Sequence, residues 1–286
     1  MPEVAETALT AEILNKYLKN KKLDKLDFVS GRYTRHKAKG YAEFKKALPL
    51  TVNKVDSKGK FIWLELTSPK TKQKWYILNT LGMTGMWSLT EPPRPRAILT
   101  LDKTKHAYFM DDRNFGTLTF TSNAADLDHK LSQLGPDFLK DDNVDLTPIQ
   151  SSAKPIYELL MDQKKIGSGL GNYLVTEILY RAGISPHRPG NKITNKELTT
   201  LDHWIKDLVK LSYIDNHSKY MANLSKQAAG LKKKDYHPKT KPKEKTLTFM
   251  VYRQKVDPHG NKVKVDRLMG EGRAGRSVYW VPKLQK

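Results

Sequence analysis

The stretch GSGLGNYLVTEILYRAG, residues 167–183, joins a glycine-rich turn to an apolar helix and sets the organisation of the chain. Glycines permit a tight turn, and the apolar residues after them recur at helical spacing. Backbone amides at the start of such a helix can hold a phosphate, although a plain turn between two helices has the same sequence. The glycines follow neither the dinucleotide-binding nor the Walker spacing, so the stretch does not indicate a nucleotide-binding protein.

Helical spacing surrounds this turn. Thr194 and Glu197 have capping-box spacing, and Gly183 stands where a helix is expected to end. Residues 231–245 are basic, contain two prolines and have few apolar side chains, which predicts a mobile loop. After this loop, TLTFMVY, a PHGN turn, KVKVD and SVYWV predict strands and a β-hairpin. The four predicted helices are YELLMDQ, GNYLVTEILYRAG, LTTLDHWIKDLVKLS and SKYMANLSKQ.

The N-terminal half has a different spacing of apolar residues. An amphipathic helix is predicted over residues 3–19. Between about 24 and 122, short apolar runs alternate with turn residues, which predicts an antiparallel β-sandwich or barrel. The runs are LTVNKV, KFIWLEL, KWYILN, AILTLD and HAYFM.

The composition favours a polyanionic partner. The chain has 51 Lys and Arg against 30 Asp and Glu, a formal charge of +21 over 286 residues. Neutralising phosphates releases counterions, so nucleic acid is the expected partner. No apolar run reaches the ~18 residues that span a bilayer, and we expect no membrane partner.

Cysteine is absent, and no histidines stand in an HExxH arrangement. The chain therefore has no thiolate zinc site, and we expect neither a metal nor a cofactor. The segment MPEVAETALTAEIL carries acidic residues where a secretory signal is positive. We expect a soluble intracellular protein, in the nucleus or at a site of replication if the chain is eukaryotic or viral.

The N-terminal residues Met1-Pro2-Glu3 include groups that can act in catalysis. Removal of Met1 would expose a secondary amine. An α-amino group has a pKa of ~7.7–8.0, against ~10.4 for lysine, so its neutral fraction can attack a sugar aldehyde carbon. Glu3 and Glu6 are close enough in sequence to move protons for that amine. Acidic residues in a first helical turn also simply complement the helix dipole, and this ordinary alternative stands beside the catalytic one.

Pro2-Glu3 at the start, GLGN before a helix and GRSVYW near the end share their order and spacing with the formamidopyrimidine-DNA glycosylase/endonuclease VIII (Fpg/Nei) family, which the chain resembles over nearly its whole length. The resemblance implies an α+β multi-domain fold. It begins with a terminal helix and a two-layer antiparallel β-sandwich, followed by a helix-two-turn-helix domain and a β-hairpin finger. The expected boundaries are 2–123 for the sandwich, 124–152 for a linker, 153–245 for the helical domain and 246–286 for the finger.

The resemblance also implies a reaction. The activity is that of a bifunctional DNA glycosylase and abasic-site lyase that flips out oxidised bases and cleaves by β,δ-elimination. Pro2 looks like the Schiff-base nucleophile, and Glu3 like the residue that transfers protons at the deoxyribose ring. Glu6 resembles the second acid of the terminal helix. Lys60 resembles a hairpin lysine that faces the lesion phosphate; without the resemblance it would be a solvated turn lysine.

Three further residues resemble phosphate contacts of the family. Lys164 and Asn172 lie in the helix-two-turn-helix segment, and Arg276 is similar to the arginine of the finger.

Another three resemble the group that fills the space left by the extruded base. Met83 lies in LGMTG, and Arg113 and Phe115 lie in DDRNFG. When a nucleotide is extruded, the space left in the base stack must be filled by a bulky apolar side chain, and the base that has lost its partner needs a hydrogen-bond donor. Ordinary core packing is the alternative for Met83 and Phe115.

The departures from the family are informative. Members with a zinc finger carry two cysteine pairs in the C-terminal segment, whereas VYRQKVDPHGNKV has none, and Val281 and Leu284 occupy the positions of the second pair. The finger is therefore expected to be zincless, with packing of Tyr279, Trp280 and Val281 in place of the metal. Zincless fingers occur in the Nei-like branch, including giant-virus members, which favours oxidised pyrimidines over 8-oxoguanine. The opening PEVAET also differs from the PELPEV of the purine-specific branch.

Two other functions remain open at this stage. A protein of this fold could bind abasic or single-stranded DNA without cutting it. A ribosomal or chromatin-type basic protein is disfavoured by five tryptophans and an organised globular pattern. The expected partner is damaged double-stranded DNA, with single-stranded DNA also open, bound by a monomer.

Overall fold

The computed structural model describes residues 2–227, 246–268 and 275–286, and within 217–227 only the backbone. The chain divides into two compact units, which we describe separately. The described part of unit 1 comprises residues 2, 6–133 and 216–227. That of unit 2 comprises residues 3–5, 134–215, 246–268 and 275–286.

Unit 1 is built on eight antiparallel strands in the order β5-β7-β6-β1-β2-β3-β4-β8. The strands are β1 (Lys22–Phe28), β2 (Leu50–Lys58), β3 (Phe61–Thr67), β4 (Lys74–Thr80), β5 (Met86–Ser88), β6 (Ala97–Leu101), β7 (Lys105–Met110) and β8 (Thr117–Thr121). The pair β1–β2 is joined at only two positions, Lys22 with Thr51 and Leu23 with Leu50. The sheet therefore opens at that pair into two layers, and the predicted two-layer sandwich is confirmed.

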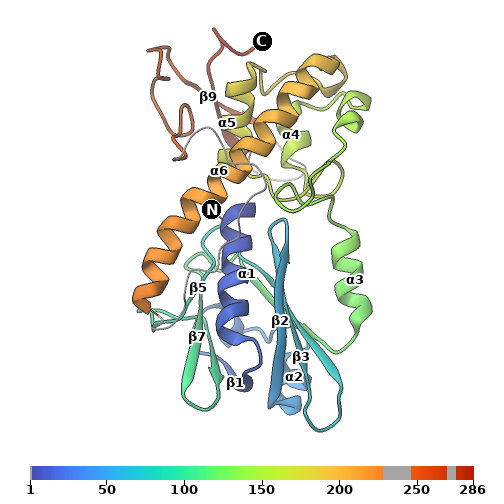
Figure 1. Cartoon of the computed structure of the whole chain (residues 1–286), viewed down its shortest axis with the longest axis vertical. Helices are drawn as coiled ribbons and strands as arrows, with labels where there is room; N and C mark the ends of the chain where they lie inside the picture. Colours follow the sequence, from blue (N-terminus) through green and yellow to red (C-terminus); the bar gives the residue numbers. More distant parts are fainter. Residues whose placement is uncertain (1, 228–245, 269–274) are drawn as a thin grey trace. The chain divides into compact units, whose positions relative to one another are not determined.

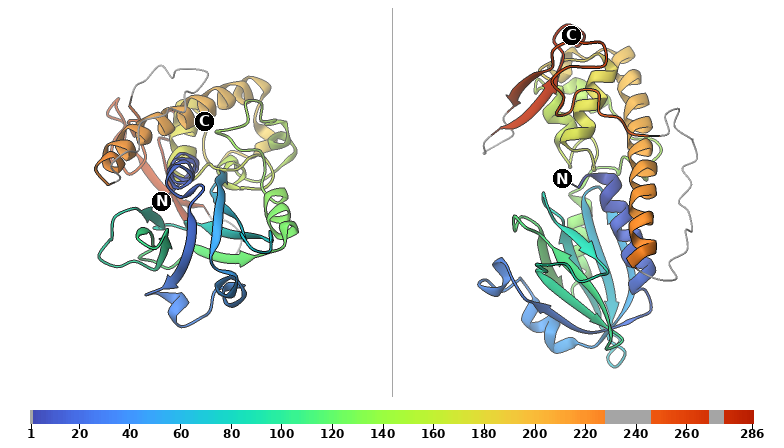
Figure 2. Two further views of the ribbon diagram at one scale, coloured as in Figure 1. Left: turned by 60° about the horizontal axis from the view of Figure 1, so that its bottom comes forward. Right: turned by 90° about the vertical axis from the view of Figure 1, so that its left-hand side faces the viewer.

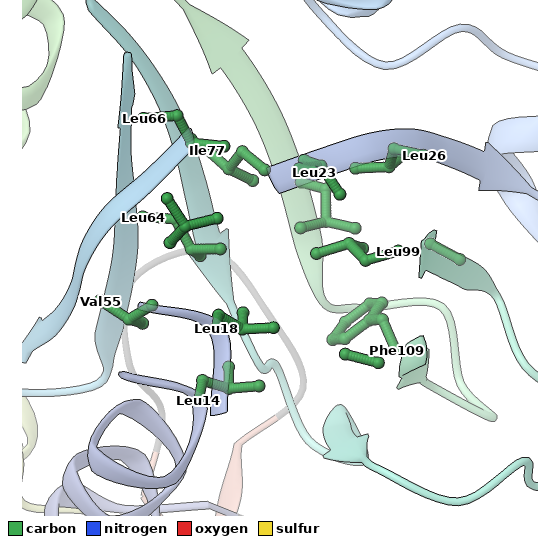
Figure 3. Close-up of a cluster of buried hydrophobic side chains, with 14 of the residues drawn as sticks. Leu14, Leu18, Leu23, Leu26, Val55, Leu64, Leu66, Ile77, Leu99 and Phe109 are labelled. Carbon is green, nitrogen blue, oxygen red and sulfur yellow. The ribbon is translucent and has the colours of Figure 1, made fainter. Parts of the chain in front are cut away.

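The core of unit 1 fills the space between these layers. Buried leucines of β1 and β6 meet apolar side chains of β2, β3 and β4 (Figure 3). Helix α1 (Val4–Leu18) runs along the strands (Figures 1 and 2) and adds Leu14 and Leu18 to the same core, both fully buried. The helix predicted over residues 3–19 is confirmed, and so are all five strands that the apolar runs predicted.

Some elements of unit 1 were not anticipated. Strand β1 reads KLDKLDF and buries only Leu23 and Leu26, with a register shift between Leu23 and Lys25, so its alternation is weak. Residues 124–152, expected as a linker, contain helix α3 (Ala124–Ser132) of unit 1 and the short helix η2 (Thr147–Ser151) of unit 2. Helix α3 buries only Leu127, which explains why its apolar pattern was missed. The remaining short elements are η1 (Arg32–Thr34) and α2 (Tyr41–Ala47).

Unit 2 is mainly helical. Its further elements are α4 (Ile156–Met161), α5 (Asn172–Ala182), η3 (Gly190–Lys192) and α6 (Asn195–Gln227), whose residues from 216 onward belong to unit 1. The helix ends follow the sequence signals. Thr194 and Glu197 exchange capping-box hydrogen bonds, and Gly183 closes α5 in the left-handed conformation with φ 70°.

The prediction of two separate helices at 198–212 and 218–227 is wrong, because α6 runs through both without a break. The residues at the join interrupt the apolar pattern, but Ser212 and Tyr213 are buried. The hydroxyl of Ser212 lies 2.8 Å from that of Tyr173. Packing therefore keeps the helix intact where its sequence is polar.

The C-terminal segment forms a hairpin of β9 (Lys264–Leu268) and β10 (Arg276–Trp280), drawn in red in Figure 2. The strand predicted from TLTFMVY, residues 246–252, is wrong, because this segment is irregular. Its amides at Met250, Val251 and Tyr252 instead donate to the carboxylate of Glu177 at 2.8–3.0 Å. The predicted loop at 231–245 lies outside the described residues.

The finger is held to the helices by packing and by carboxylates. Val281 is buried in a cluster with Tyr180, Val251 and Val263, against which Tyr279 also packs. The turn at PHGN is closed by Asp257, whose carboxylate accepts the amides of His259 and Asn261, at 3.0 and 2.7 Å, and the hydroxyl of Tyr180. Within the described ranges, no three His, Asp or Glu side chains gather into a metal site.

Asp266 is a second carboxylate anchor of the finger. It accepts hydrogen bonds from the indole of Trp280 at 2.7 Å and from Nε2 of His187 at 2.9 Å. Burial by itself would raise the pKa of Asp266, but hydrogen bonds from Trp280, His187 and Lys264 outweigh burial and lower it. Trp280 is therefore held by a charged acceptor, and not by apolar packing alone.

Glu177→Ala should destabilise unit 2 by about 3 kcal/mol, because it strands the buried amides that the carboxylate satisfies. Urea unfolding followed by circular dichroism measures this change. Glu177→Gln keeps one acceptor oxygen and should lose about half as much. Glu158→Ala removes a half-exposed carboxylate from the neighbouring helix α4 and serves as the control. Equal unfolding free energies for Glu177→Ala and Glu158→Ala would contradict the anchoring role.

Asp266→Asn should cost about 2 kcal/mol near pH 7, because a charged acceptor is lost. The folded pKa of Asp266 lies below its ordinary value of 3.8, so its stabilisation is complete above that value and is lost as the pH falls through the folded pKa. The difference between wild type and variant should therefore shrink as the pH falls from neutral to below 3.8. A difference in urea-unfolding free energy that is independent of pH would contradict this account.

Candidate active site

The glycine-rich turn before α5 receives the N-terminal residues of the chain. The amide of Val4 donates to the carbonyl of Gly169 at 3.0 Å, and a side chain at Gly169 would collide with Val4. Gly169 has φ +116°, a conformation that favours glycine. The turn therefore serves as a seat for the start of α1.

Glu3 is fully buried at this seat. Its carboxylate accepts the amides of Gly171 at 2.7 Å, Tyr173 at 2.9 Å and Leu174 at 3.3 Å, all in the first turn of α5. A Cβ at Gly171 would lie 2.3 Å from Cδ of Glu3, so only glycine permits this approach. A carboxylate is favoured at a helix N-terminus by the helix dipole and the unpaired amides.

This arrangement corrects the hypothesis that these amides hold a phosphate. The anion at the N-terminus of α5 is Glu3 of the same chain. Pro2 immediately precedes Glu3 and is half-buried. Because the two residues are covalently joined, the bonds of Glu3 limit where the nitrogen of Pro2 can lie.

Asn172 and Arg276 come together in unit 2. The side-chain amide of Asn172 donates to the carbonyl of Ser277 at 3.0 Å, beside Arg276. The hydroxyl of Tyr157 donates to Oδ1 of Asn172 at 2.9 Å. Burial raises the pKa of Tyr157 well above its usual value. The charge of Arg276 opposes this rise and that of Glu3 adds to it, but burial prevails, so the hydroxyl stays protonated as a donor. Asn172 thus links α4 to the finger strand β10.

A pocket of about 470 Å³ opens beside Arg276. Its cationic lining comes from Lys154, Lys165 and Arg276. Lys164, which the sequence analysis selected, does not line it; its side chain is exposed and its amide binds Asp162. Sequence reasoning missed Lys154 and Tyr157, because helical spacing does not reveal which residues of neighbouring segments face the finger.

Glu6 and Lys60 lie in unit 1. Oε1 of Glu6 accepts a hydrogen bond from Nδ2 of Asn216, in helix α6, at 3.1 Å. Lys60 is half-buried in the turn between β2 and β3, on the hairpin where the sequence analysis expected it. Their catalytic roles remain predictions.

Met83, Arg113 and Phe115 lie on two adjacent loops of unit 1. Met83 is 40% exposed and Phe115 is 53% exposed, which excludes core packing for both. The guanidinium of Arg113 lies 4.8 Å from the ring centre of Phe115. We call these three residues the wedge.

The two wedge loops are tied together by polar contacts. The hydroxyl of Thr84 donates to Asp111 at 2.6 Å, and the amide of Arg113 donates to the hydroxyl of Thr84 at 3.1 Å. Gly82 packs so closely on the other loop that a Cβ would lie 2.7 Å from the amide nitrogen of Gly116. The structure therefore brings the three predicted wedge residues onto one surface.

Among the described residues, no helix is both long enough and apolar enough to cross a membrane.

Comparison with known proteins places these features in a family. The N-terminal, H2TH and C-terminal domain profiles of formamidopyrimidine-DNA glycosylase match residues 1–118, 134–220 and 238–286. The formamidopyrimidine-DNA glycosylase of Corynebacterium efficiens is 30% identical over 213 residues, which are 70% of this chain and 74% of the relative. That of Geobacter metallireducens is 29% identical over 266 residues, 90% of each chain.

Solved structures agree with the fold. The crystal structure of Lactococcus lactis Fpg with DNA that contains an oxidised pyrimidine matches with a TM-score of 0.75 at 20% identity, and the match covers 100% of both chains. The three domain profiles and the sequence relatives, with which the seating of Glu3 on the GLGN turn agrees, show that the chain belongs to the formamidopyrimidine-DNA glycosylase family.

Proposed function

We propose that this protein is a bifunctional DNA glycosylase and abasic-site lyase of base-excision repair. The observation that carries the proposal is the seating of Glu3 on the first turn of α5, which fixes the acid that directly follows Pro2 in the chain. A nucleophilic amine and a fixed proton carrier are the two groups that this chemistry requires.

The reaction begins when the neutral nitrogen of Pro2 attacks C1′ of an extruded nucleotide. The glycosidic bond breaks, and the base departs as an anion that takes a proton from water. The Glu3 carboxylate accepts the proton of the attacking nitrogen and passes it to the ring oxygen as the sugar opens to an iminium. Loss of a C2′ proton then expels the 3′ phosphate, and a second elimination expels the 5′ phosphate. The product is a gap with phosphate at both ends, and no step requires a metal.

DNA engagement is assigned to three groups of residues. Arg276, with Lys154 and Lys165 around the pocket, supplies cations for backbone phosphates, in keeping with the net charge of +21. Lys60 and Lys164 remain candidates for further phosphate contacts. The wedge enters the space from which the damaged base is extruded, where its exposed apolar side chains become buried.

Oxidised pyrimidines are the favoured substrates. The zincless finger sequence and the PEVAET opening support this preference, as they resemble the Nei-like branch. Single-turnover excision rates on matched duplexes that carry an oxidised pyrimidine, a hydantoin or 8-oxoguanine test it. A faster rate on 8-oxoguanine would overturn the preference and leave the glycosylase proposal intact.

Pro2→Gly should reduce borohydride trapping on abasic DNA at least tenfold, because the rigid secondary amine that gives a permanently charged iminium is lost. A protein that retains Met1 should not be trapped, because its proline nitrogen lies within a peptide bond. Trapping is measured as a covalent protein–DNA band. If Pro2→Gly were trapped as fully as wild type and Lys60→Ala were not trapped, the nucleophile would be Lys60 and not Pro2. If the wild-type protein were not trapped, the lyase proposal would be wrong, and the protein would be a non-catalytic binder of abasic or single-stranded DNA.

Arg276→Ala should weaken binding to damaged and undamaged duplex and lower the salt slope by about one unit for each lost phosphate contact. Arg267→Ala is the matched control, because Arg267 lies on the same hairpin and is exposed, but points to the opposite face from Arg276. Base excision should suffer more than cleavage of a preformed abasic site, which is extruded more easily. Equal salt slopes for the two variants would remove the finger from DNA binding.

A further inference from the structure

The loop that carries Arg113 and Phe115, residues 111–116, has no regular structure of its own. Within it, Asn114 adopts φ 54°, a left-handed conformation that costs energy for residues other than glycine. Phe115 stands 53% exposed in water. A loop with these properties needs support from outside if it is to keep a single conformation.

Arg96 supplies support from one side. It stands just before β6 and its side chain is only 15% exposed. Its guanidinium donates to the carbonyls of Asp111 at 2.8 Å and Asp112 at 3.4 Å, and to the hydroxyl of Ser30 at 3.1 Å. One rigid, permanently charged fork therefore binds the first two residues of the loop.

Arg32 supplies support from the other side. Its guanidinium donates to the carbonyls of Asn114 at 3.3 Å and Gly116 at 2.7 Å, and its amide donates to Oδ1 of Asn114 at 3.3 Å. It also donates to the hydroxyl of Tyr33 at 2.7 Å, which in turn accepts the amide of Leu118. Arg32 thus binds the backbone of the second half of the loop, as Arg96 binds that of the first half.

We propose that Arg32 and Arg96 are positioning residues for the wedge, a role that rests on the function proposed above. Together their guanidiniums bind four of the six carbonyls of the loop, those of Asp111, Asp112, Asn114 and Gly116. The loop is held in one conformation before DNA arrives, so less conformational entropy is lost when Phe115 enters the stack. The two arginines act through Arg113 and Phe115 and need not touch DNA.

Arg94 provides a matched control for Arg96. Both guanidiniums lie 3.9 Å from the same carboxylate oxygen of Asp112, but Arg94 is 76% exposed. Arg94→Gln therefore removes the same charge and the same ion pair, and leaves the hydrogen bonds of Arg96 to the loop in place. Any effect that is due only to positive charge should appear equally in both variants.

The test is the ratio of affinities for two duplexes of one sequence, one of which carries a tetrahydrofuran in place of a nucleotide. Because tetrahydrofuran lacks a base, only this duplex has a gap in its base stack that the wedge can enter. The measurement is of binding alone and does not depend on catalysis. Arg32→Gln and Arg96→Gln should lower the preference about tenfold, as far as Phe115→Ala does, and should add nothing in the Phe115→Ala background. Arg96→Lys should behave like Arg96→Gln, because one ammonium cannot replace the fork.

Several outcomes would overturn the proposal. They are an unchanged preference in Arg96→Lys or Arg32→Gln, an additive effect with Phe115→Ala, an equal loss in Arg94→Gln, and a wild-type protein that does not prefer the duplex with the hole. Urea unfolding checks each variant, and Arg96→Lys and Arg32→Gln carry the test if Arg96→Gln does not fold. Because the ratio is independent of catalysis, failed borohydride trapping would remove the proposed function without deciding this result.

Discussion

The seating of the Glu3 carboxylate on the first turn of α5 is the contact on which the site depends. A buried carboxylate is tolerated only when its oxygens are hydrogen-bonded, and here three backbone amides satisfy them. Gly171 must lack a side chain for the carboxylate to reach those amides, and Gly169 must adopt a conformation that favours glycine. The glycines of the turn and the acid at the third position therefore depend on one another.

Carboxylates bound by hydrogen-bond donors recur through unit 2. Glu177 gathers three amides of the segment before the finger, Asp257 closes a turn, and Asp266 binds Trp280 and His187. Each of these carboxylates thus has a structural use within unit 2. The net charge of +21 leaves a large excess of basic side chains to face a phosphate backbone.

Much of the fold follows from local sequence signals. Short apolar runs between turn residues predicted five strands correctly, and the capping box at Thr194 and the glycine at 183 marked helix ends. The errors occurred where packing overrides local preference. TLTFMVY has strand composition but is irregular, because Glu177 takes its amides. Helix α6 continues past Ser212, where the first predicted helix ends, and both Ser212 and the next residue, Tyr213, are buried.

The sequence by itself determined the order Pro2-Glu3 at the start of the chain, the excess of basic residues and the family, because those depend on residue identity, order and spacing. Tertiary structure decided which charges meet. It brought Lys154 and Lys165 to the pocket of Arg276, gave the amides of α5 to Glu3 in place of a phosphate, and set Arg32 and Arg96 against the wedge loop. Arg32 lies 82 and 84 positions from the carbonyls of Asn114 and Gly116 that it binds. No local pattern encodes such a pair, because the contact exists only after the sandwich has brought the two segments together.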